Sequence, residues 1–168
     1  MTLTLSGVCG LFCRACPVYI ATREAPERLR PLAERFGVTS EEMACDGCRS
    51  NRRGVACRSC EFVPCAKAKD VDFCVACDEY PCERLVRFKD RKPHRIELWE
   101  DNERIRTAGF ETWFDEMVGH YSCKVCDRVN SSYDLVCRDC GGEPASEFIA
   151  KHGEIIREHW KRINRQEG

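Results

Sequence analysis

The chain has 168 residues, of which fifteen are cysteine, and its 27 basic and 28 acidic side chains give a formal net charge of −1 at pH 7. This balance gives no support for nucleic-acid binding by the molecule as a whole, and no apolar run approaches the roughly 20 residues that span a bilayer, so we expect no membrane partner. The cysteine count is odd, and the N-terminus lacks the basic and apolar segments of a signal peptide. Both observations argue against a disulfide framework, so we expect metal ligation in the reducing cytoplasm.

Cysteine density divides the chain into four predicted regions. Residues 1–92 contain eleven cysteines and are predicted to form a Cys-rich metal-binding module, whereas residues 93–120 contain none and form a helical connector. Residues 121–142 contain four cysteines and are predicted to be a zinc ribbon, and residues 143–168 a C-terminal amphipathic helix. We therefore expect a small, irregular, metal-stabilised α+β fold, in which short β-hairpins surround the metal knuckles and helices pack over them.

The first three cysteines have the spacing Cys9-x3-Cys13-x2-Cys16. Three sulfurs are one short of a tetrahedral zinc site, so the fourth ligand is left open between His94, Asp46 and a vacant position of the kind that catalysis uses. Radical S-adenosylmethionine enzymes use the same spacing, but their large βα barrel needs about 200 residues or more. A non-radical iron–sulfur cluster is the alternative to zinc at these three cysteines.

Two helices are predicted between these cysteines and the next ones. Residues 26–36 place apolar side chains on one helical face, and Gly37 is the expected stop. Thr39 and Glu42 have the spacing of a capping box, which predicts a second, short helix that leads directly to Cys45.

An internal repeat supplies the next six cysteines. Residues 57–65 and 74–82 both have the pattern Cys-x2-Cys-x3-Pro-Cys, so each copy offers three sulfurs and must borrow a fourth ligand. Cys45 and Cys48 are the nearest spare pair. The simplest sequential grouping makes one site of Cys45, Cys48, Cys57 and Cys60 and another of Cys65, Cys74, Cys77 and Cys82. A cross-braced arrangement uses the same eight residues, and spacing does not separate the two.

The residues that link these cysteines resemble a known family. Residues 9–22, 45–50, 57–66 and 73–85 are similar to the uncharacterised prokaryotic family called domain of unknown function 3795. The resemblance extends over roughly residues 7–88 and includes all eleven cysteines found there. It implies a small metal-binding module without an assigned activity, and it says little about the connector, the ribbon and the tail.

The connector and the tail are predicted to be helical. Residues 144–163 are amphipathic, and Pro144 suits the first position of a helix. Within the connector, four apolar residues recur at helical spacing between two glycines, and we interpret them as core packing: Phe110, Trp113, Phe114 and Met117.

The second group of cysteines is the most specific motif of the chain. Cys123-x2-Cys126 and Cys137-x2-Cys140 are separated by ten residues, which is enough for a hairpin that returns the second pair to the first. Zinc in structural sites takes four ligands in a tetrahedron, and a Cys-x2-Cys turn directs two sulfurs at one ion. The motif therefore predicts a four-cysteine zinc site.

The predicted function is that of a non-catalytic zinc-binding protein, with three or four ions, that presents a surface to a protein partner. No catalytic triad, phosphate loop or zinc-protease motif is visible, so we predict no catalytic residue. The alternatives are an iron–sulfur redox or electron-transfer protein that uses Cys9, Cys13 and Cys16, and a metalloenzyme with an open metal position. A nucleic-acid partner has weaker support, from basic residues that we interpret first as a solvated face: Arg84, Arg87, Lys89, Arg91, Lys92 and Arg95.

Overall fold

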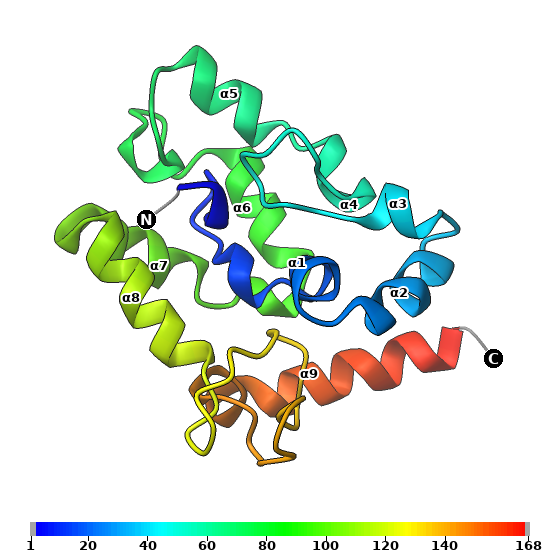
Figure 1. Ribbon diagram of the computed structural model, residues 1–168. Helices are drawn as coiled ribbons and strands as arrows, with labels where there is room; N and C mark the ends of the chain where they lie inside the picture. The colour runs from blue at the N-terminus through cyan, green and yellow to red at the C-terminus, as the bar shows by residue number, and fades with distance from the viewer. Residues whose placement is uncertain (1–2, 167–168) are drawn as a thin grey trace.

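The computed structural model describes residues 3–166, and this part of the chain is mostly helical (Figure 1). No β-strand forms among these residues; the extended pairing consists of two isolated antiparallel bridges, Ser6–Phe12 and Ser122–Val129. The prediction of an α+β fold is therefore wrong. None of the helices between residues 3 and 166 combines the length and the apolar character that a membrane crossing requires.

The Cys-x2-Cys segments explain why the expected hairpins are missing. The N–H of Cys16 donates to the carbonyl oxygen of Cys13 over 3.0 Å, and the N–H of Cys77 donates to that of Cys74 over 3.1 Å. These turns satisfy backbone groups within four residues, so no partner strand is needed. These two knuckles consequently appear as the short 3-10 turns that begin at Cys13 and Cys74.

Short elements make up the N-terminal half, and longer helices make up the C-terminal half. The 3-10 turns are η1 (Leu3–Leu5), η2 (Cys13–Ala15), η3 (Pro26–Arg28), η4 (Cys74–Ala76) and η5 (Pro93–Arg95). The α-helices of the N-terminal half are α1 (Pro17–Arg23), α2 (Leu29–Arg35), α3 (Ser40–Met43), α4 (Val55–Arg58), α5 (Phe62–Ala68) and α6 (Glu83–Asp90). They are followed by α7 (Leu98–Ala108), α8 (Phe110–Tyr121) and α9 (Glu147–Gln166).

Most of the predicted helix boundaries agree with the structure. The helix expected over residues 26–36 is η3 continued by α2, and Gly37 follows it with a φ of 64°. The capping box is confirmed: the N–H of Glu42 donates to Thr39 Oγ1 over 3.2 Å, and the N–H of Thr39 donates to Glu42 Oε2 over 2.9 Å.

The start predicted for the C-terminal helix is wrong. Pro144 lies before α9, in a cis peptide with Glu143, and the helix begins at Glu147. The intervening residues belong to the loop around the second cysteine group, because the N–H of Ala145 donates to the carbonyl oxygen of Leu135 over 3.1 Å. The chain therefore closes the ribbon before it enters the helix.

The aromatic stripe of the connector packs in the larger of two hydrophobic clusters, as predicted. Trp113 and Phe114 of α8 are buried, and Phe110 and Met117 pack against the same cluster with part of their surface exposed. Phe148 of α9 is fully buried there as well, so this cluster joins the last two helices. The smaller cluster lies around α5, α6 and the start of α7 and includes Phe62, Leu85 and Leu98.

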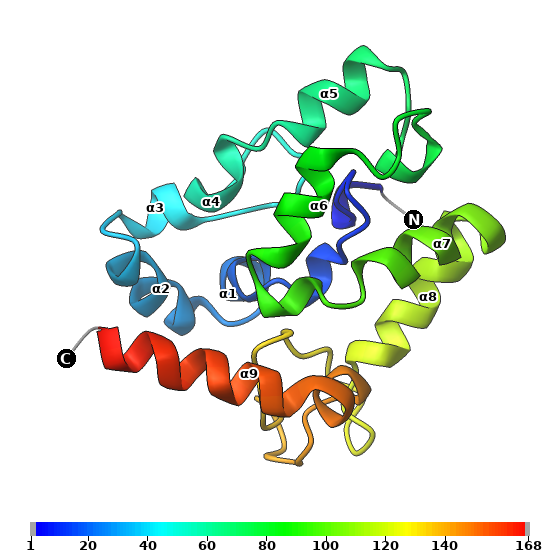
Figure 2. The same ribbon diagram turned by 180° about the vertical axis from the view of Figure 1, so that it is seen from behind.

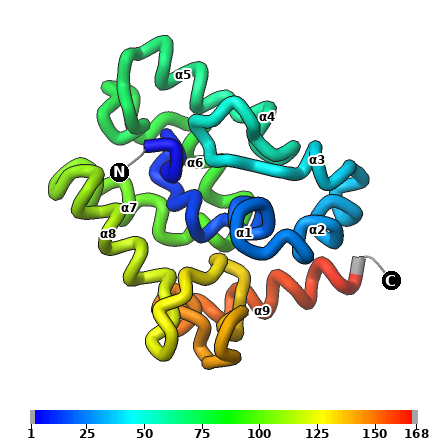
Figure 3. The backbone as a smooth tube through the Cα atoms, in the orientation of Figure 1, coloured from blue at the N-terminus to red at the C-terminus, as the bar shows by residue number. Residues whose placement is uncertain are grey.

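The segment between α8 and α9 lies against the N-terminal half (Figures 1 and 2). The N–H of Ser132 donates to the carbonyl oxygen of Ala15 in η2 over 3.1 Å. Arg28 Nη2 lies 2.5 Å from Asp134 Oδ1, and most of the Asp134 side chain is shielded from solvent. The tube through the Cα atoms shows α9 passing below α1 and α2 (Figure 3), and the Arg35 guanidinium lies 5.1 Å from the ring centre of Trp160.

Candidate metal centre

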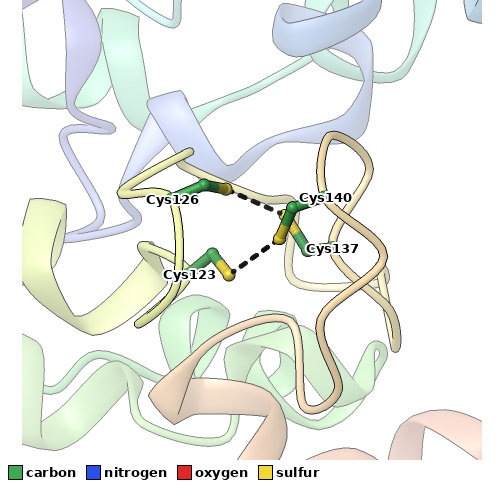
Figure 4. A group of neighbouring side chains, drawn as sticks. All are labelled: Cys123, Cys126, Cys137 and Cys140. Atoms are coloured by element: carbon green, nitrogen blue, oxygen red, sulfur yellow. Dashed lines mark hydrogen bonds between the residues drawn. The ribbon is translucent and has the colours of Figure 1, made fainter.

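The four cysteines of the C-terminal motif converge on one point (Figure 4). Their four Sγ atoms all lie within 4.8 Å of one another. The Sγ atoms of Cys123 and Cys140 are 3.6 Å apart, and so are those of Cys126 and Cys137. Four sulfurs around one tetrahedral zinc ion, each at about 2.3 Å, are about 3.8 Å from one another. The donor set therefore fits a single ion of this kind.

Two knuckles with the same backbone hydrogen bonds carry these sulfurs. The N–H of Asp127 donates to the carbonyl oxygen of Cys123 over 3.0 Å, as the N–H of Gly141 does to that of Cys137 over 3.1 Å. The residue after the second cysteine is left-handed in both knuckles, with a φ of 57° at Asp127 and 73° at Gly141. Glycine adopts this conformation without steric cost, and Asn and Asp tolerate it better than other residues. This explains why the two positions are occupied by Asp127 and Gly141.

A buried asparagine connects the two knuckles. Asn130 is fully buried, and its Nδ2 donates to the carbonyl oxygens of Arg128 and Ala145 and lies 3.5 Å from Cys137 Sγ. Its Oδ1 accepts from the N–H of Arg138 over 3.0 Å. The side chain of Asn130 therefore fixes the positions of the two knuckles and the loop before α9 relative to one another. It also donates to the sulfur of Cys137.

The electrostatics of the four thiols favour a bound cation. Burial opposes ionisation of Cys137, but the N–H groups of Cys140 and Asp139 and the amide of Asn130 outweigh it and lower its pKa to about 6. At Cys126 a backbone N–H favours the thiolate, but burial and the three neighbouring thiols raise its pKa to about 12. A second thiolate is thus unfavourable beside the first, and a divalent cation removes that repulsion.

The eleven N-terminal cysteines are also free thiols, but they are less closely gathered. Among the described residues, the ribbon cysteines are the one group of three or more His, Cys, Asp or Glu whose ligand atoms all lie within 4.8 Å. The last four of the eleven line one small cavity: Cys65, Cys74, Cys77 and Cys82. Their grouping around one space is the one that sequential assignment predicts.

The first seven cysteines interleave in space. Burial raises the pKa of Cys13, and the neighbouring thiols of Cys48 and Cys16 raise it further. Burial also raises the pKa of Cys57 to about 12, with additional contributions from Cys16 and Cys45. The segment that contains Cys13 and Cys16 therefore lies beside the Cys45–Cys48 turn, and the N–H of Cys45 donates to Thr22 Oγ1 in α1 over 3.0 Å.

Both candidate fourth ligands for the first cysteine group have other partners. His94 Nδ1 lies 2.6 Å from the hydroxyl oxygen of Tyr133, and removal from solvent lowers the pKa of His94 to about 3. Asp46 accepts two hydrogen bonds from the guanidinium of Arg52, over 2.8 and 2.9 Å, which lowers its pKa. Neither side chain is held toward the sulfurs by these contacts.

Sequence reasoning missed the residues that support the site. Asp127 occupies the position that Gly141 has in the second knuckle, and an alignment of the two knuckles by their cysteines would have pointed to it. No local pattern marks Asn130, because its partners lie up to 15 residues further along the chain. Its role depends on how the two knuckles face each other.

Comparison with known families gives one match. Residues 5–87 match the family model described as a protein of unknown function (DUF3795), which confirms the resemblance inferred from the linking residues. The match ends before α7, and it includes all eleven N-terminal cysteines but none of the ribbon. Searches of curated proteins and of solved structures found no match.

Proposed function

With residues 5–87 matched to the DUF3795 family, we propose that this chain is a non-catalytic zinc-binding protein that presents a surface to a protein partner. The observation that carries the proposal is the group of four Sγ atoms within 4.8 Å of one another at the ribbon. Four protein ligands complete the coordination of one zinc ion and leave no position for a substrate, which is the pattern of structural zinc sites.

The spacing of the sulfurs supports a single ion in preference to an iron–sulfur cluster at the ribbon. In a cluster the four cysteine sulfurs are divided among two or more iron atoms, and the inorganic core separates them. Two of the Sγ–Sγ distances at the ribbon are 3.6 Å and all four sulfurs lie within 4.8 Å of one another, which leaves room for one metal atom. The N–H of Val125, 3.4 Å from Cys123 Sγ, and the amide of Asn130 stabilise the negative charge of the thiolates around such an ion.

A groove between η5 and α9 is the surface that we assign to the partner. It has a volume of about 510 Å³, and its rim carries four cations: Lys89, Arg91, Lys92 and Arg162. Asp90 is the one acidic residue that lines it. Within residues 3–166, neither Arg91, Lys92 nor Arg162 has a carboxylate at ion-pair distance. Burial lowers the pKa of His159 in this groove, and the charges of Lys92 and Arg162 lower it further, as expected where the potential is positive.

The floor of the groove favours an acidic protein segment over a nucleic acid. Isoleucines from both sides line it, namely Ile96, Ile155 and Ile163, and Ile155 is 41% exposed. Single-stranded nucleic acid is held by stacking of bases on aromatic rings. His159 is the one aromatic residue among those that line the groove. A segment that alternates acidic and aliphatic side chains complements both the rim and the floor.

Metal content and absorbance test the first part of the proposal. Protein purified without oxygen should be colourless and should contain zinc, and replacement of zinc by cobalt should give the intense visible bands of a tetrahedral thiolate site. The variant Cys140→Ser should lose one equivalent of metal per chain. A brown protein with iron and inorganic sulfide in place of zinc would support the redox alternative and contradict the proposal.

Binding of a defined peptide tests the second part. A labelled peptide that alternates Glu and Leu should bind the wild-type chain at low salt, and the double variant Arg91→Glu/Arg162→Glu should bind at least tenfold more weakly. The matched control is Arg104→Glu/Arg106→Glu on α7, outside the groove. Tighter binding of an oligothymidylate of equal charge would favour a nucleic-acid partner, and equal binding by both double variants would remove the groove from the proposal.

A further inference from the structure

A second set of four cysteines surrounds a small cavity beside α5 and α6. The cavity has a volume of about 30 Å³ and is lined by cysteines from three elements. Cys65 lies in α5, Cys74 and Cys77 lie at the start and just past the end of η4, and Cys82 precedes the first residue of α6. A space of this size holds one ion or one or two water molecules.

The backbone presents three of these cysteines in turns closed by hydrogen bonds between residues i and i+3, which are one residue shorter than the knuckles of the ribbon. The N–H of Cys77 donates to the carbonyl oxygen of Cys74 over 3.1 Å, and the N–H of Tyr80 donates to that of Cys77 over 2.9 Å. The N–H of Leu85 donates to the carbonyl oxygen of Cys82 over 2.9 Å, so that Cys82 begins a helix and its side chain sits at the helix start. Local hydrogen bonds thus fix the backbone at three of the four cysteines.

Two cations face the same cavity. The guanidinium of Arg84 donates to Cys65 Sγ over 3.3 Å, and Lys69 also lines the cavity, where its Nζ pairs with Glu79 Oε1 over 2.6 Å. A zinc ion bound by four thiolates carries a net charge of about −2, which nearby cations stabilise. Glu79 offsets the charge of Lys69, so Arg84 leaves the lining with one net positive charge. This charge lies beside the sulfurs, where it stabilises a thiolate-bound divalent metal.

We propose that Cys65, Cys74, Cys77 and Cys82 bind a second zinc ion, independently of the ribbon. Each of the four thiols loses one proton as its sulfur binds, so one Zn²⁺ replaces four protons and the site goes from neutral to −2. The sulfurs line the cavity without being gathered as closely as those of the ribbon, and small side-chain rotations bring them onto the ion. Arg84 is a positioning residue that stabilises the charge.

Metal counting on full-length variants tests the site. The double variant Cys74→Ser/Cys77→Ser should contain one zinc fewer per chain than the wild type after loading under reducing conditions and gel filtration. Cys140→Ser should also lose one zinc, and the combined variant should lose two, because the two sites do not share a ligand. A double variant that keeps the zinc content of the wild type would overturn the proposal, and it would do so without affecting the assignment of the ribbon.

A footprint on the wild-type chain covers the case in which the double variant does not fold. Alkylation followed by mass spectrometry should show all four cysteines protected in the zinc-loaded protein, and they should become reactive together as a chelator is added. Reactivity that is equal with and without zinc, or that appears at different chelator concentrations for the four cysteines, would overturn the proposal.

The role of Arg84 has its own test. In Arg84→Ala the four cysteines should become reactive toward alkylation at least tenfold faster in the presence of chelator, because the anionic site loses a stabilising donor. The matched control is Arg87→Ala on the same helix, whose guanidinium pairs with Glu83 and does not line the cavity. Equal rates in the two variants would remove Arg84 from the site.

Discussion

The ribbon and the N-terminal module bring their cysteines together in different ways. At the ribbon four cysteines from one segment, residues 123–140, lie within 4.8 Å of one another, and their turns are closed by hydrogen bonds between neighbours in the chain. In the N-terminal half, cysteines of a comparable site come from separate short elements such as α5, η4 and the start of α6. The ribbon cysteines are therefore arranged by their backbone, whereas the cysteines of the site proposed in the N-terminal half are brought together by packing between elements.

This difference has a physical consequence for folding. Ligands that the backbone already holds together lose little conformational entropy when a metal binds, but ligands on separate elements must be ordered at that moment. The N-terminal half has only short helices, which are marginal on their own and rely on tertiary contacts. We expect the ribbon to bind metal more tightly than the N-terminal half, because less conformational entropy is lost there on binding.

The largest effect should follow from loss of a buried ribbon ligand. Cys137→Ser breaks the four-thiolate set, and a large part of the roughly 10 kcal/mol that zinc binding typically contributes to a structural site is lost with it. Hydrogen exchange should show loss of protection at the N–H groups of Cys137 and Asn130, which bond to Gly142 and Tyr121. Val125→Ala, at a side chain that is 78% exposed in the same ribbon, is the control. Unchanged exchange in Cys137→Ser would mean that the ribbon does not depend on its metal.

Removal of the asparagine that joins the two knuckles should have the next largest effect. Asn130→Ala leaves the N–H of Arg138 and the carbonyl oxygen of Ala145 without their partner, which should cost about 2–3 kcal/mol in the free energy of unfolding. Metal affinity at the ribbon should fall about 10- to 100-fold, because a donor to Cys137 Sγ is lost. Denaturant unfolding and chelator competition measure the two effects, with the exposed Asn51→Ala as the control.

A buried carboxyl group between α7 and α8 should make stability depend on pH. Burial raises the pKa of Asp101 in α7 to about 7, and the nearby charge of Glu97 adds to this increase. The hydrogen bond from Trp113 Nε1 and the charge of His120 lower the pKa but do not outweigh burial. The folded chain therefore holds this proton more tightly than the unfolded chain, whose Asp pKa is about 3.9, so the carboxyl contributes stability that rises as pH falls from about 7 toward 4.

The variant Asp101→Asn tests this dependence. At pH 8 its free energy of unfolding, measured with denaturant, should exceed that of the wild type by about 1–2 kcal/mol. Its free energy of unfolding should also change less than that of the wild type between pH 5 and 8. Glu100→Gln, an exposed acid on the same helix, is the control and should leave the pH profile unchanged. Parallel pH profiles for Asp101→Asn and the wild type would show that Asp101 does not titrate in this range.

The smallest effect should come from the ion pair that joins the ribbon to the N-terminal half. A double-mutant cycle of Arg28→Ala and Asp134→Asn should give a coupling of about 0.5–1 kcal/mol, because the pair is partly shielded from solvent. The exposed pair of Arg30 and Glu34 within α2 should give a smaller value under the same conditions. A coupling near zero for Arg28 and Asp134 would indicate that the two regions unfold independently of this contact.

Much of the candidate site was predictable because its signals are local. The spacing of the ribbon cysteines predicts their convergence, and the capping box at Thr39 and the stripe around Trp113 are found as expected. The predicted β-hairpins were wrong because the knuckles close by turns of a few residues, and strand pairing depends on partners that spacing does not reveal. The start of α9 was wrong because Ala145 is bound to Leu135 in the ribbon.

By itself, the sequence determined the convergence of the four ribbon cysteines, the matched family segment and the helical periodicity of the connector. Each of these follows from residues close together in the chain. Tertiary structure alone decided that Asn130 joins the knuckles, that Asp134 meets Arg28 and that Arg84 faces Cys65. These contacts arise when separate elements pack to bury apolar surface, and that packing depends on the whole chain at once.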